Sequence, residues 1–164
     1  MDLGCGNGHF TAKLLEAGFK RLGALDYSEA AIQLAKDFIG ADAERNDADL
    51  CIYAADILHP ESIPEFNKYS VIVDKGTFDA ISLSGKDTIQ DLAPAFKATL
   101  KRLSCHDPQG TKPLFIITSC NWTSTELKNI FGSELVAVDE IEHSSFTFGG
   151  RKGQDVSTVI FEIN

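Results

Sequence analysis

The sequence predicts a single α/β domain, residues 1–164, built on a mostly parallel β-sheet with an antiparallel hairpin at its C-terminal end. Short apolar runs that suit strands alternate with amphipathic runs that suit helices, an order typical of parallel strands joined by helical crossovers. The last two strand-like runs instead follow each other with no helix between them. The length suits one buried core, and no linker or repeat divides the chain.

The chain opens on a glycine-rich turn. Asp2 is followed by glycines at positions 4, 6 and 8, and a helix-like run begins directly after them. Glycines in this arrangement permit sharp backbone geometry and let a ligand lie against bare main chain, as in the strand-to-helix turn of nucleoside-binding α/β domains. Only Met1 precedes Asp2, so we expect the first strand of the sheet to be largely missing.

The next three strands each end beside an aspartate. They are expected at Leu22–Asp26, Ala48–Ala54 and Tyr69–Asp74. Ser28 is a suitable N-cap for the helix that follows the first of them. Because ligands of open parallel sheets bind at the carboxyl ends of the strands, we expect Asp26, Asp56 and Asp74 to surround one site.

The second half of the chain supplies the remaining elements. Apolar residues over 89–103 recur at helical spacing, and we expect Pro94 to kink this helix or to start a new one. A fifth strand over Pro113–Thr118 leads into a helix capped by Thr123 or Ser124. A hairpin with a long glycine-rich connection ends the chain. Its expected strands are Ser133–Glu142 and Asp155–Ile163.

Composition excludes several classes of function. The 15 basic and 24 acidic residues give a net charge of -9, which repels a phosphate backbone, so nucleic acid is not the expected partner. The acidic surface suits a basic protein partner, and solubility alone explains it equally well. No apolar run is long enough to span a bilayer. The cysteines and histidines are scattered without metal-ligand spacing, so we expect no metal and reduced thiols in a cytosolic or nuclear protein.

Two nucleoside cofactors compete for the glycine turn. A nicotinamide dinucleotide is usually bound by Gly-x-Gly-x-x-Gly, but His9 occupies the position of its third glycine. Asp2 disfavours a pyrophosphate and favours a cationic ligand, and S-adenosylmethionine, with its sulfonium and amino groups, fits this requirement. Asp26 is placed to accept hydrogen bonds from ribose hydroxyls, and Asp56 is expected near the adenine.

Three further motifs carry a family resemblance. DKGTFDAI at 74–81, ITSCNWT at 117–123 and FTFGGRKG at 146–153 resemble the eukaryotic lysine methyltransferases that modify translation elongation factor 1-alpha, and most closely the branch numbered two. The resemblance implies a Rossmann-like class I methyltransferase fold, and a monomeric, cytoplasmic enzyme that methylates a lysine of that factor and releases S-adenosylhomocysteine. We expect the cofactor to contact Asp2, Gly4, Cys5, Gly6, Asp26, Tyr27, Ala55, Asp56, Ile57 and Asp74.

The reaction requires a neutral lysine amine held in line with the methyl group. A free lysine has a pKa near 10.4, which an apolar channel lowers and a carboxylate raises while orienting the amine. We expect Asp74 to orient the amine, or else only to contact cofactor as a strand-end acid. Asn121 and Trp122 follow the fifth strand at the same edge, where an aromatic face guides a cation, although Trp122 also suits simple packing. Phe146, Phe148 and Arg151 are expected to form a substrate rim.

Two alternatives stay open from the sequence. One is a methyltransferase of the same fold that acts on another protein or on a small molecule. The other is a catalytically silent module that only binds the cofactor or only keeps the fold. The short start of the chain also suggests a fragment of a longer enzyme. In that case unpaired backbone groups and an apolar gap are expected beside the missing part of the first strand.

Overall fold

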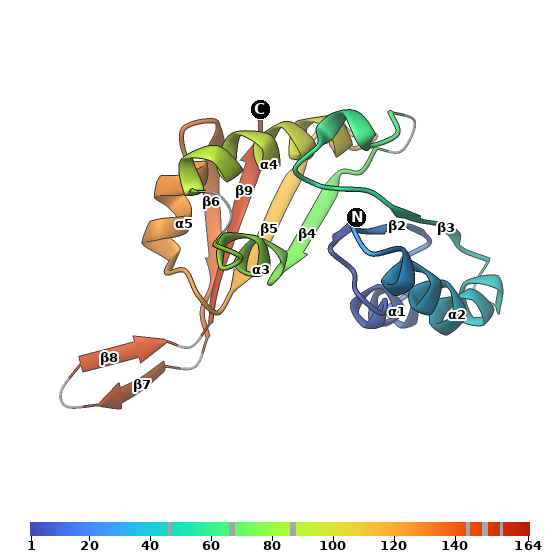
Figure 1. The fold of residues 1–164 in the computed structure, drawn as a ribbon, viewed down its shortest axis with the longest axis horizontal. Coiled ribbons are helices and arrows are strands. Elements are labelled where there is room, and N and C mark those ends of the chain that lie inside the picture. The colour runs from blue at the N-terminus through green and yellow to red at the C-terminus, as the bar shows by residue number, and fades with distance from the viewer. Residues whose placement is uncertain (46, 66–67, 86–87, 144, 149–150, 155) are drawn as a thin grey trace.

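A seven-stranded sheet forms the body of the protein (Figure 1). The computed structural model describes residues 1–45, 47–65, 68–85, 88–143, 145–148, 151–154 and 156–164, with side chains except at 41–45, 145–148 and 151–154. In spatial order the strands are β3 (Asp49–Ala54), β2 (Arg21–Asp26), β1 (Asp2–Leu3), β4 (Val71–Lys75), β5 (Leu114–Ser119), β9 (Ser157–Ile163) and β6 (Leu135–Ile141). Strands β1 to β5 run parallel, and β9 runs antiparallel between β5 and β6. The predicted fold class is confirmed.

Helices cover the two faces of the sheet in separate groups (Figure 1). They are α1 (His9–Glu16), α2 (Glu29–Arg45), α3 (Thr77–Ser82), α4 (Ile89–Leu103) and α5 (Ser124–Phe131), with a short 3-10 helix, η1 (Pro60–Ser62). Successive strand residues point to opposite faces. On β2, Leu22 and Ala24 pack with residues of α1 and α2, whereas Leu25 belongs to the larger core beneath α3, α4 and α5.

Strand β1 lies at the centre of the sheet in spite of its two residues. Leu3 is fully buried and pairs with Leu25 of β2 and with Asp74 of β4. Met1 adds two further hydrogen bonds to β4, because its amino group donates to the Val71 carbonyl oxygen at 2.8 Å and its carbonyl oxygen accepts from Val73 N at 2.8 Å. Below it, a cavity of about 750 Å³ opens between β2 and β4, lined in part by Met1, Leu14 and Val71.

The structure decides between two expectations for one element and corrects another. Helix α4 continues through Pro94, so the alternative that Pro94 starts a new helix is wrong. The Thr88–Asp91 capping box fixes its start, and the burial of Leu92, Phe96 and Leu100 outweighs the one backbone hydrogen bond that a proline cannot donate. The connection between the last two strands of the body is not a simple loop, because it contains the antiparallel strands β7 (Ser145–Phe148) and β8 (Arg151–Gln154).

Helix boundaries otherwise follow the local chemistry that the sequence indicated. Ser28 Oγ accepts a hydrogen bond from Ala31 N at the start of α2. Thr123 forms a reciprocal capping box with Glu126 at the start of α5. No helix in the described part of the chain has the length and apolar character needed to cross a membrane.

Candidate functional site

The glycine turn after β1 is held in a conformation that favours glycine. Gly4, Gly6 and Gly8 have φ angles of 68°, 53° and 80°. A Cβ on Gly4 would lie 2.0 Å from Thr77 Oγ1, and one on Gly8 would lie 2.4 Å from Ile39 Cδ1. A Cβ on Gly6 would meet no heavy atom within 4 Å. Gly4 and Gly8 therefore permit close packing of the turn, whereas Gly6 leaves bare main chain facing open space.

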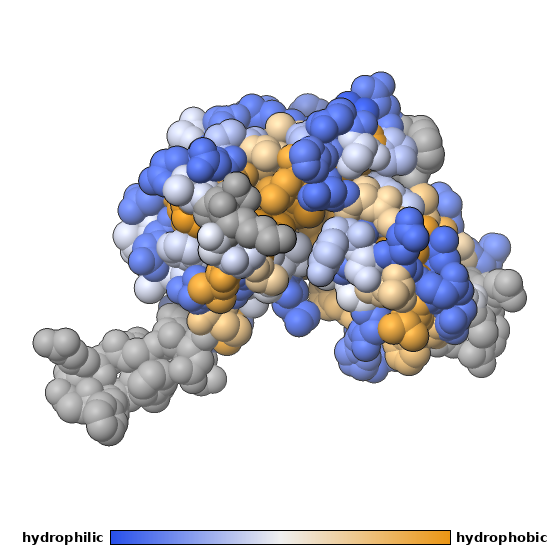
Figure 2. All heavy atoms as spheres, viewed as in Figure 1, coloured by the Kyte–Doolittle hydropathy of each residue, from blue (hydrophilic) through white to orange (hydrophobic). Residues whose placement is uncertain are grey.

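A cleft of about 450 Å³ lies beside this turn, at the carboxyl ends of the first three strands. Figure 2 shows hydrophobic residues gathered toward the middle of the molecule, with hydrophilic residues along the upper rim of that face. Of the residues predicted to contact cofactor, the cleft is lined by Gly4, Asp26, Tyr27, Asp56 and Ile57. The opposite wall comes from the end of β4 and from α3.

Asp26 connects the glycine turn to the end of β2. Its Oδ2 accepts a hydrogen bond from Gly6 N at 2.9 Å, and its Oδ1 accepts one from Ser28 N at 2.9 Å. The residue is 8% exposed and lines the cleft. A carboxylate offers about four acceptor positions. Asp26 therefore retains acceptor capacity for the hydroxyl groups of a ligand while it holds the turn in place.

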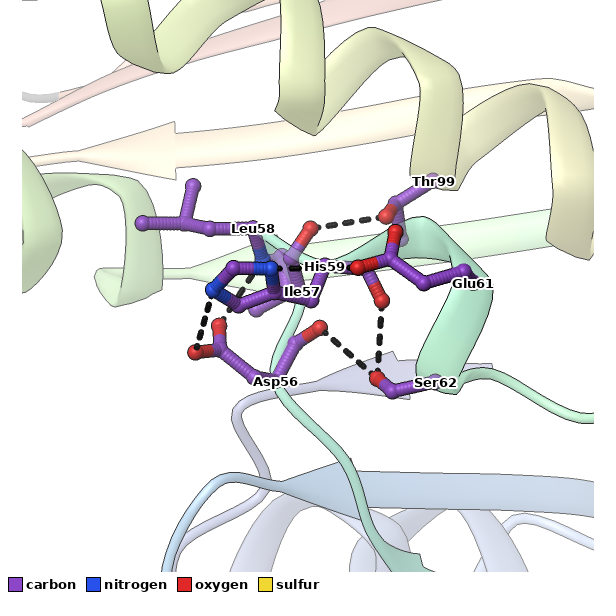
Figure 3. A network of polar contacts seen from close by, with 7 residues as sticks. All are labelled: Asp56, Ile57, Leu58, His59, Glu61, Ser62 and Thr99. Carbon is purple, nitrogen blue, oxygen red and sulfur yellow. Dashed lines mark hydrogen bonds and ion pairs between the residues drawn. The ribbon is translucent and has the colours of Figure 1, made fainter.

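Asp56 lies in the loop after β3, which is closed by its own polar contacts (Figure 3). Asp56 Oδ1 accepts from Leu58 N at 2.9 Å, and the Asp56 carbonyl oxygen accepts from His59 N at 3.0 Å. The buried Thr99 hydroxyl of α4 donates to the Ile57 carbonyl oxygen at 2.7 Å. These contacts hold Asp56 and Ile57 at the cleft from both sides of the loop.

Asp74 lies at the same sheet edge but beneath the surface. It is fully buried, and its two carboxylate oxygens accept hydrogen bonds from Thr77 N at 2.9 Å and Phe78 N at 3.0 Å. Burial raises its pKa to about 7, and these two hydrogen bonds oppose that rise. In the described structure Gly76 and Thr77 line the cleft, but Asp74 does not.

Three other residues predicted to contact cofactor, Asp2, Cys5 and Ala55, make hydrogen bonds near the glycine turn or the end of β2. Asp2 is buried and accepts a hydrogen bond from Thr11 Oγ1 at 2.7 Å, and burial raises the pKa of its carboxyl. Cys5 N donates to the Leu25 carbonyl oxygen at 2.9 Å, which ties the turn to β2. Ala55 N donates to the Asp26 carbonyl oxygen at 3.0 Å. In the described structure these three residues and Gly6 do not line the cleft.

Asn121 and Trp122 follow β5, as predicted, and Trp122 lies against α3. Trp122 Nε1 donates to Ser82 Oγ at 3.1 Å, and the Trp122 ring is 6.3 Å from the Phe78 ring. Neither residue is among the described residues that line the cleft. The predicted rim residues, Phe146, Phe148 and Arg151, belong to β7 and β8, and their side chains lie outside the described part of the chain. In Figure 1 these two strands project away from the sheet.

Sequence reasoning missed the wall of the cleft that α3 forms. Thr77, Ala80 and Ile81 of α3 line the cleft, and so do Lys75, Gly76 and Ser84, which flank the helix. Leu25 and Leu58 join the lining from the other side. Gly76, with a φ of 86°, is the N-cap of this short helix. A glycine four residues before the apolar pair Ala80–Ile81 was the available signal, but six helical residues are too few for a periodic pattern to stand out.

The fold and the cleft together are typical of nucleoside-binding α/β proteins. A parallel sheet bears a glycine turn, an acid at the end of the adjacent strand and a cleft at their shared edge. The chain belongs to the methyltransferase-domain family, whose model matches residues 1–158. The methyltransferase domain of bacterial CtHen1-C has the same fold, with a TM-score of 0.71 at 15% identity over 99% of this chain and 87% of that one.

Several relatives of the chain are named lysine methyltransferases. The chain is 36% identical over 99% of its length to EEF1A lysine methyltransferase 2 of Danio rerio, and spans 65% of that protein. It is 34% identical over 98% of its length to the protein-lysine N-methyltransferase EFM4 of Saccharomyces cerevisiae, and spans 68% of that protein. The resemblance noted from the three motifs is confirmed. The chain spans about two thirds of the length of these relatives.

Proposed function

We propose that this protein transfers a methyl group from S-adenosylmethionine to a lysine side chain of a protein, and that the protein is translation elongation factor 1-alpha. One observation supports this proposal above the others. The similarity to EEF1A lysine methyltransferase 2 and to EFM4 extends over 98–99% of this chain, so it includes every residue that lines the cleft.

The residues of the cleft fit the proposed cofactor. Asp26 offers acceptors for ribose hydroxyls, and Gly6 leaves main chain open for close approach. Ile57 and Ile81 supply apolar surface from opposite walls, which suits the faces of an adenine ring. The cofactor, when bound, supplies an electrophilic methyl group on a sulfonium. Asp2, buried beneath the turn, favours such a cation in its ionised form, and a bound cation in turn opposes the rise in pKa that burial causes.

The chain's own contribution to transfer is to hold the reactants and to keep water out. For Asp74, direct contact with the lysine amine stays a prediction from the sequence. Its contacts support a positioning role, because both oxygens hold the backbone of Thr77 and Phe78 at the start of α3. Asn121 and Trp122 are proposed to approach the substrate lysine, with the indole guiding the cation before it loses its proton.

The charge of the protein favours the proposed partner. A net charge of -9 attracts a basic protein surface and accelerates encounter at low ionic strength. A cytoplasmic, monomeric enzyme is part of the proposal, and it rests on the family resemblance alone.

Methyl transfer to the purified factor tests the proposal. The protein is incubated with S-adenosylmethionine labelled on its methyl group and with elongation factor 1-alpha, and the label is then mapped to a residue by mass spectrometry. We expect one labelled lysine, and less label with Asp26→Ala at a cofactor concentration below its dissociation constant. Cofactor binding without label on the factor would contradict the proposed substrate and favour another acceptor. Absence of cofactor binding in a calorimetric titration would contradict the enzyme itself and favour a silent module.

A further inference from the structure

Helix α3 is joined to the turn that follows β5, here called the 119–122 turn, by an aspartate that the proposed chemistry does not use. Asp79 Oδ1 accepts a hydrogen bond from Ser119 Oγ at 2.6 Å, and its Oδ2 accepts one from Cys120 N at 2.8 Å. Hydrogen bonds to an ionised carboxylate are shorter and stronger than those between neutral groups. Asp79 therefore holds two consecutive residues of the turn.

Ser119 passes this restraint to the rest of the turn. Its hydroxyl is almost fully buried and accepts hydrogen bonds from Asn121 N at 3.0 Å and Trp122 N at 2.8 Å. Because the same hydroxyl donates its only proton to Asp79, its orientation is fixed and its lone pairs face the two backbone N–H groups. The backbone of Asn121 and Trp122 is thus held indirectly by the Asp79 carboxylate.

A second attachment fixes the indole of Trp122. Its Nε1 donates to Ser82 Oγ at 3.1 Å, and Ser82 Oγ donates to the Asp79 carbonyl oxygen at 3.1 Å. The ring also packs near Phe78, with 6.3 Å between ring centroids. Side chain and backbone of Trp122 are therefore both anchored to α3.

The position of α3 gives these contacts a consequence for the site. Thr77, Ala80, Ile81 and Ser84 follow helical spacing and line the cleft. Asp79 and Ser82, three residues apart, share a different face of the helix and hold the 119–122 turn. One short helix thus contacts the cleft on one side and the turn on the other.

We propose that Asp79 is a positioning residue, which sets the placement of Asn121 and Trp122 relative to the cleft and thereby aligns the substrate lysine. The proposal rests on the proposed function for its effect on methyl transfer. Its structural part, the placement of the 119–122 turn by Asp79, is measurable in the protein without any substrate.

The chain contains a built-in reporter, because Trp122 is its only tryptophan. In Asp79→Ala, tryptophan emission is expected to shift to longer wavelength and acrylamide quenching to rise, measured well below the melting temperature. We expect kcat for methyl transfer to fall about 10- to 100-fold, the scale of a small misplacement of reacting groups, with unchanged affinity for S-adenosylmethionine. For Asp79→Asn, we expect emission, quenching and kcat between those of the wild type and of Asp79→Ala, because the amide oxygen still accepts from Cys120 N.

A double variant and a matched control separate positioning from general destabilisation. Ser119→Ala breaks the same chain of hydrogen bonds, so Asp79→Ala/Ser119→Ala is expected to lose little more than either single variant. Asp107→Ala is the control. Like Asp79, Asp107 accepts two hydrogen bonds, here from Gln109 N and Thr111 N, but it lies in the loop before β5 at the opposite sheet edge. It is expected to change neither emission nor kcat.

Three results would overturn the proposal. Unchanged emission and quenching in Asp79→Ala would show that Asp79 does not hold the turn. Altered emission with unchanged kcat would show that the turn does not align the substrate. Equal losses in cofactor affinity and kcat would assign Asp79 to general support of α3. If the wild-type protein transfers no methyl group to the factor, the proposed function fails, while the emission of the variants still decides whether Asp79 holds the turn.

Discussion

The two walls of the cleft are built by different means. The wall at the ends of β1, β2 and β3 presents Gly4 and the acids Asp26 and Asp56, and Asp26, which also holds Gly6 N, keeps acceptor capacity. The α3 wall is closed behind by side-chain contacts, in which Asp74 holds the start of the helix and Asp79 holds the neighbouring turn. The first wall thus offers polar groups to a ligand, whereas the position of the second wall is fixed by hydrogen bonds to its own backbone and to the neighbouring turn. Changes in the first wall should weaken binding, and changes in the second should alter stability or turnover.

Gly4 is where the two walls touch, so its substitution should have the largest effect. In Gly4→Ala the new Cβ meets Thr77 Oγ1 at 2.0 Å in a backbone conformation with a φ of 68°. Overpacking and left-handed strain together predict a loss of about 3 kcal/mol in the free energy of unfolding. Urea denaturation without ligand measures it.

Gly6→Ala is the matched control for this prediction. Its φ is also positive, at 53°, but its Cβ meets no heavy atom within 4 Å. We expect a loss of only about 1 kcal/mol in the free energy of unfolding, from backbone strain alone. Equal losses in the two variants would contradict the contact between the walls.

Asp26 tests the wall that receives the ligand. Asp26→Ala removes acceptors for the ribose and releases Gly6 N. Hydrogen bonds to charged groups are worth about 1.5–3 kcal/mol, so affinity for S-adenosylmethionine should fall about 10- to 100-fold. Calorimetric titration measures it, with Asp37→Ala on the exposed face of α2 as control. A variant that binds as tightly as wild type would remove Asp26 from the cofactor site.

Asp74 tests the wall formed by α3 through the pH dependence of stability. Its pKa lies at about 7 in the folded protein, above the ordinary value of 3.8, because burial disfavours the charged carboxylate. The folded state therefore holds this proton more tightly, and its contribution to stability is complete below the ordinary pKa and declines as pH rises toward about 7. In Asp74→Asn, which carries no titrating proton, this decline should disappear. Unfolding by urea at several pH values measures it, and parallel profiles for the two proteins would contradict it.

The sequence predicted the wall of the cleft at the ends of β1, β2 and β3, but it did not predict the wall formed by α3. Gly4, Gly6 and Asp26 follow from the requirement for bare main chain and for an acid at a strand end, both local features. The partners of Asp74 and Asp79 depend on a helix of only six residues, which leaves no periodic signal. Asp74 shares the predicted edge, but only folding shows that both of its oxygens are satisfied by the backbone.

The C-terminal strands were also predicted only in part from the sequence. The antiparallel placement of β9 followed from two strand-like runs with no helix between them. The separate pair formed by β7 and β8 did not, because four-residue strands near glycines are read as a loop. The continuous course of α4 through Pro94 likewise depends on burial of its apolar face, which outweighs a local signal.

A crystal structure with S-adenosylhomocysteine tests the central claim most directly. The account predicts the nucleoside in the cleft, with its ribose hydroxyls on the Asp26 carboxylate and its base between Ile57 and Ile81. A nucleoside bound elsewhere, for example in the cavity between β2 and β4, would contradict it.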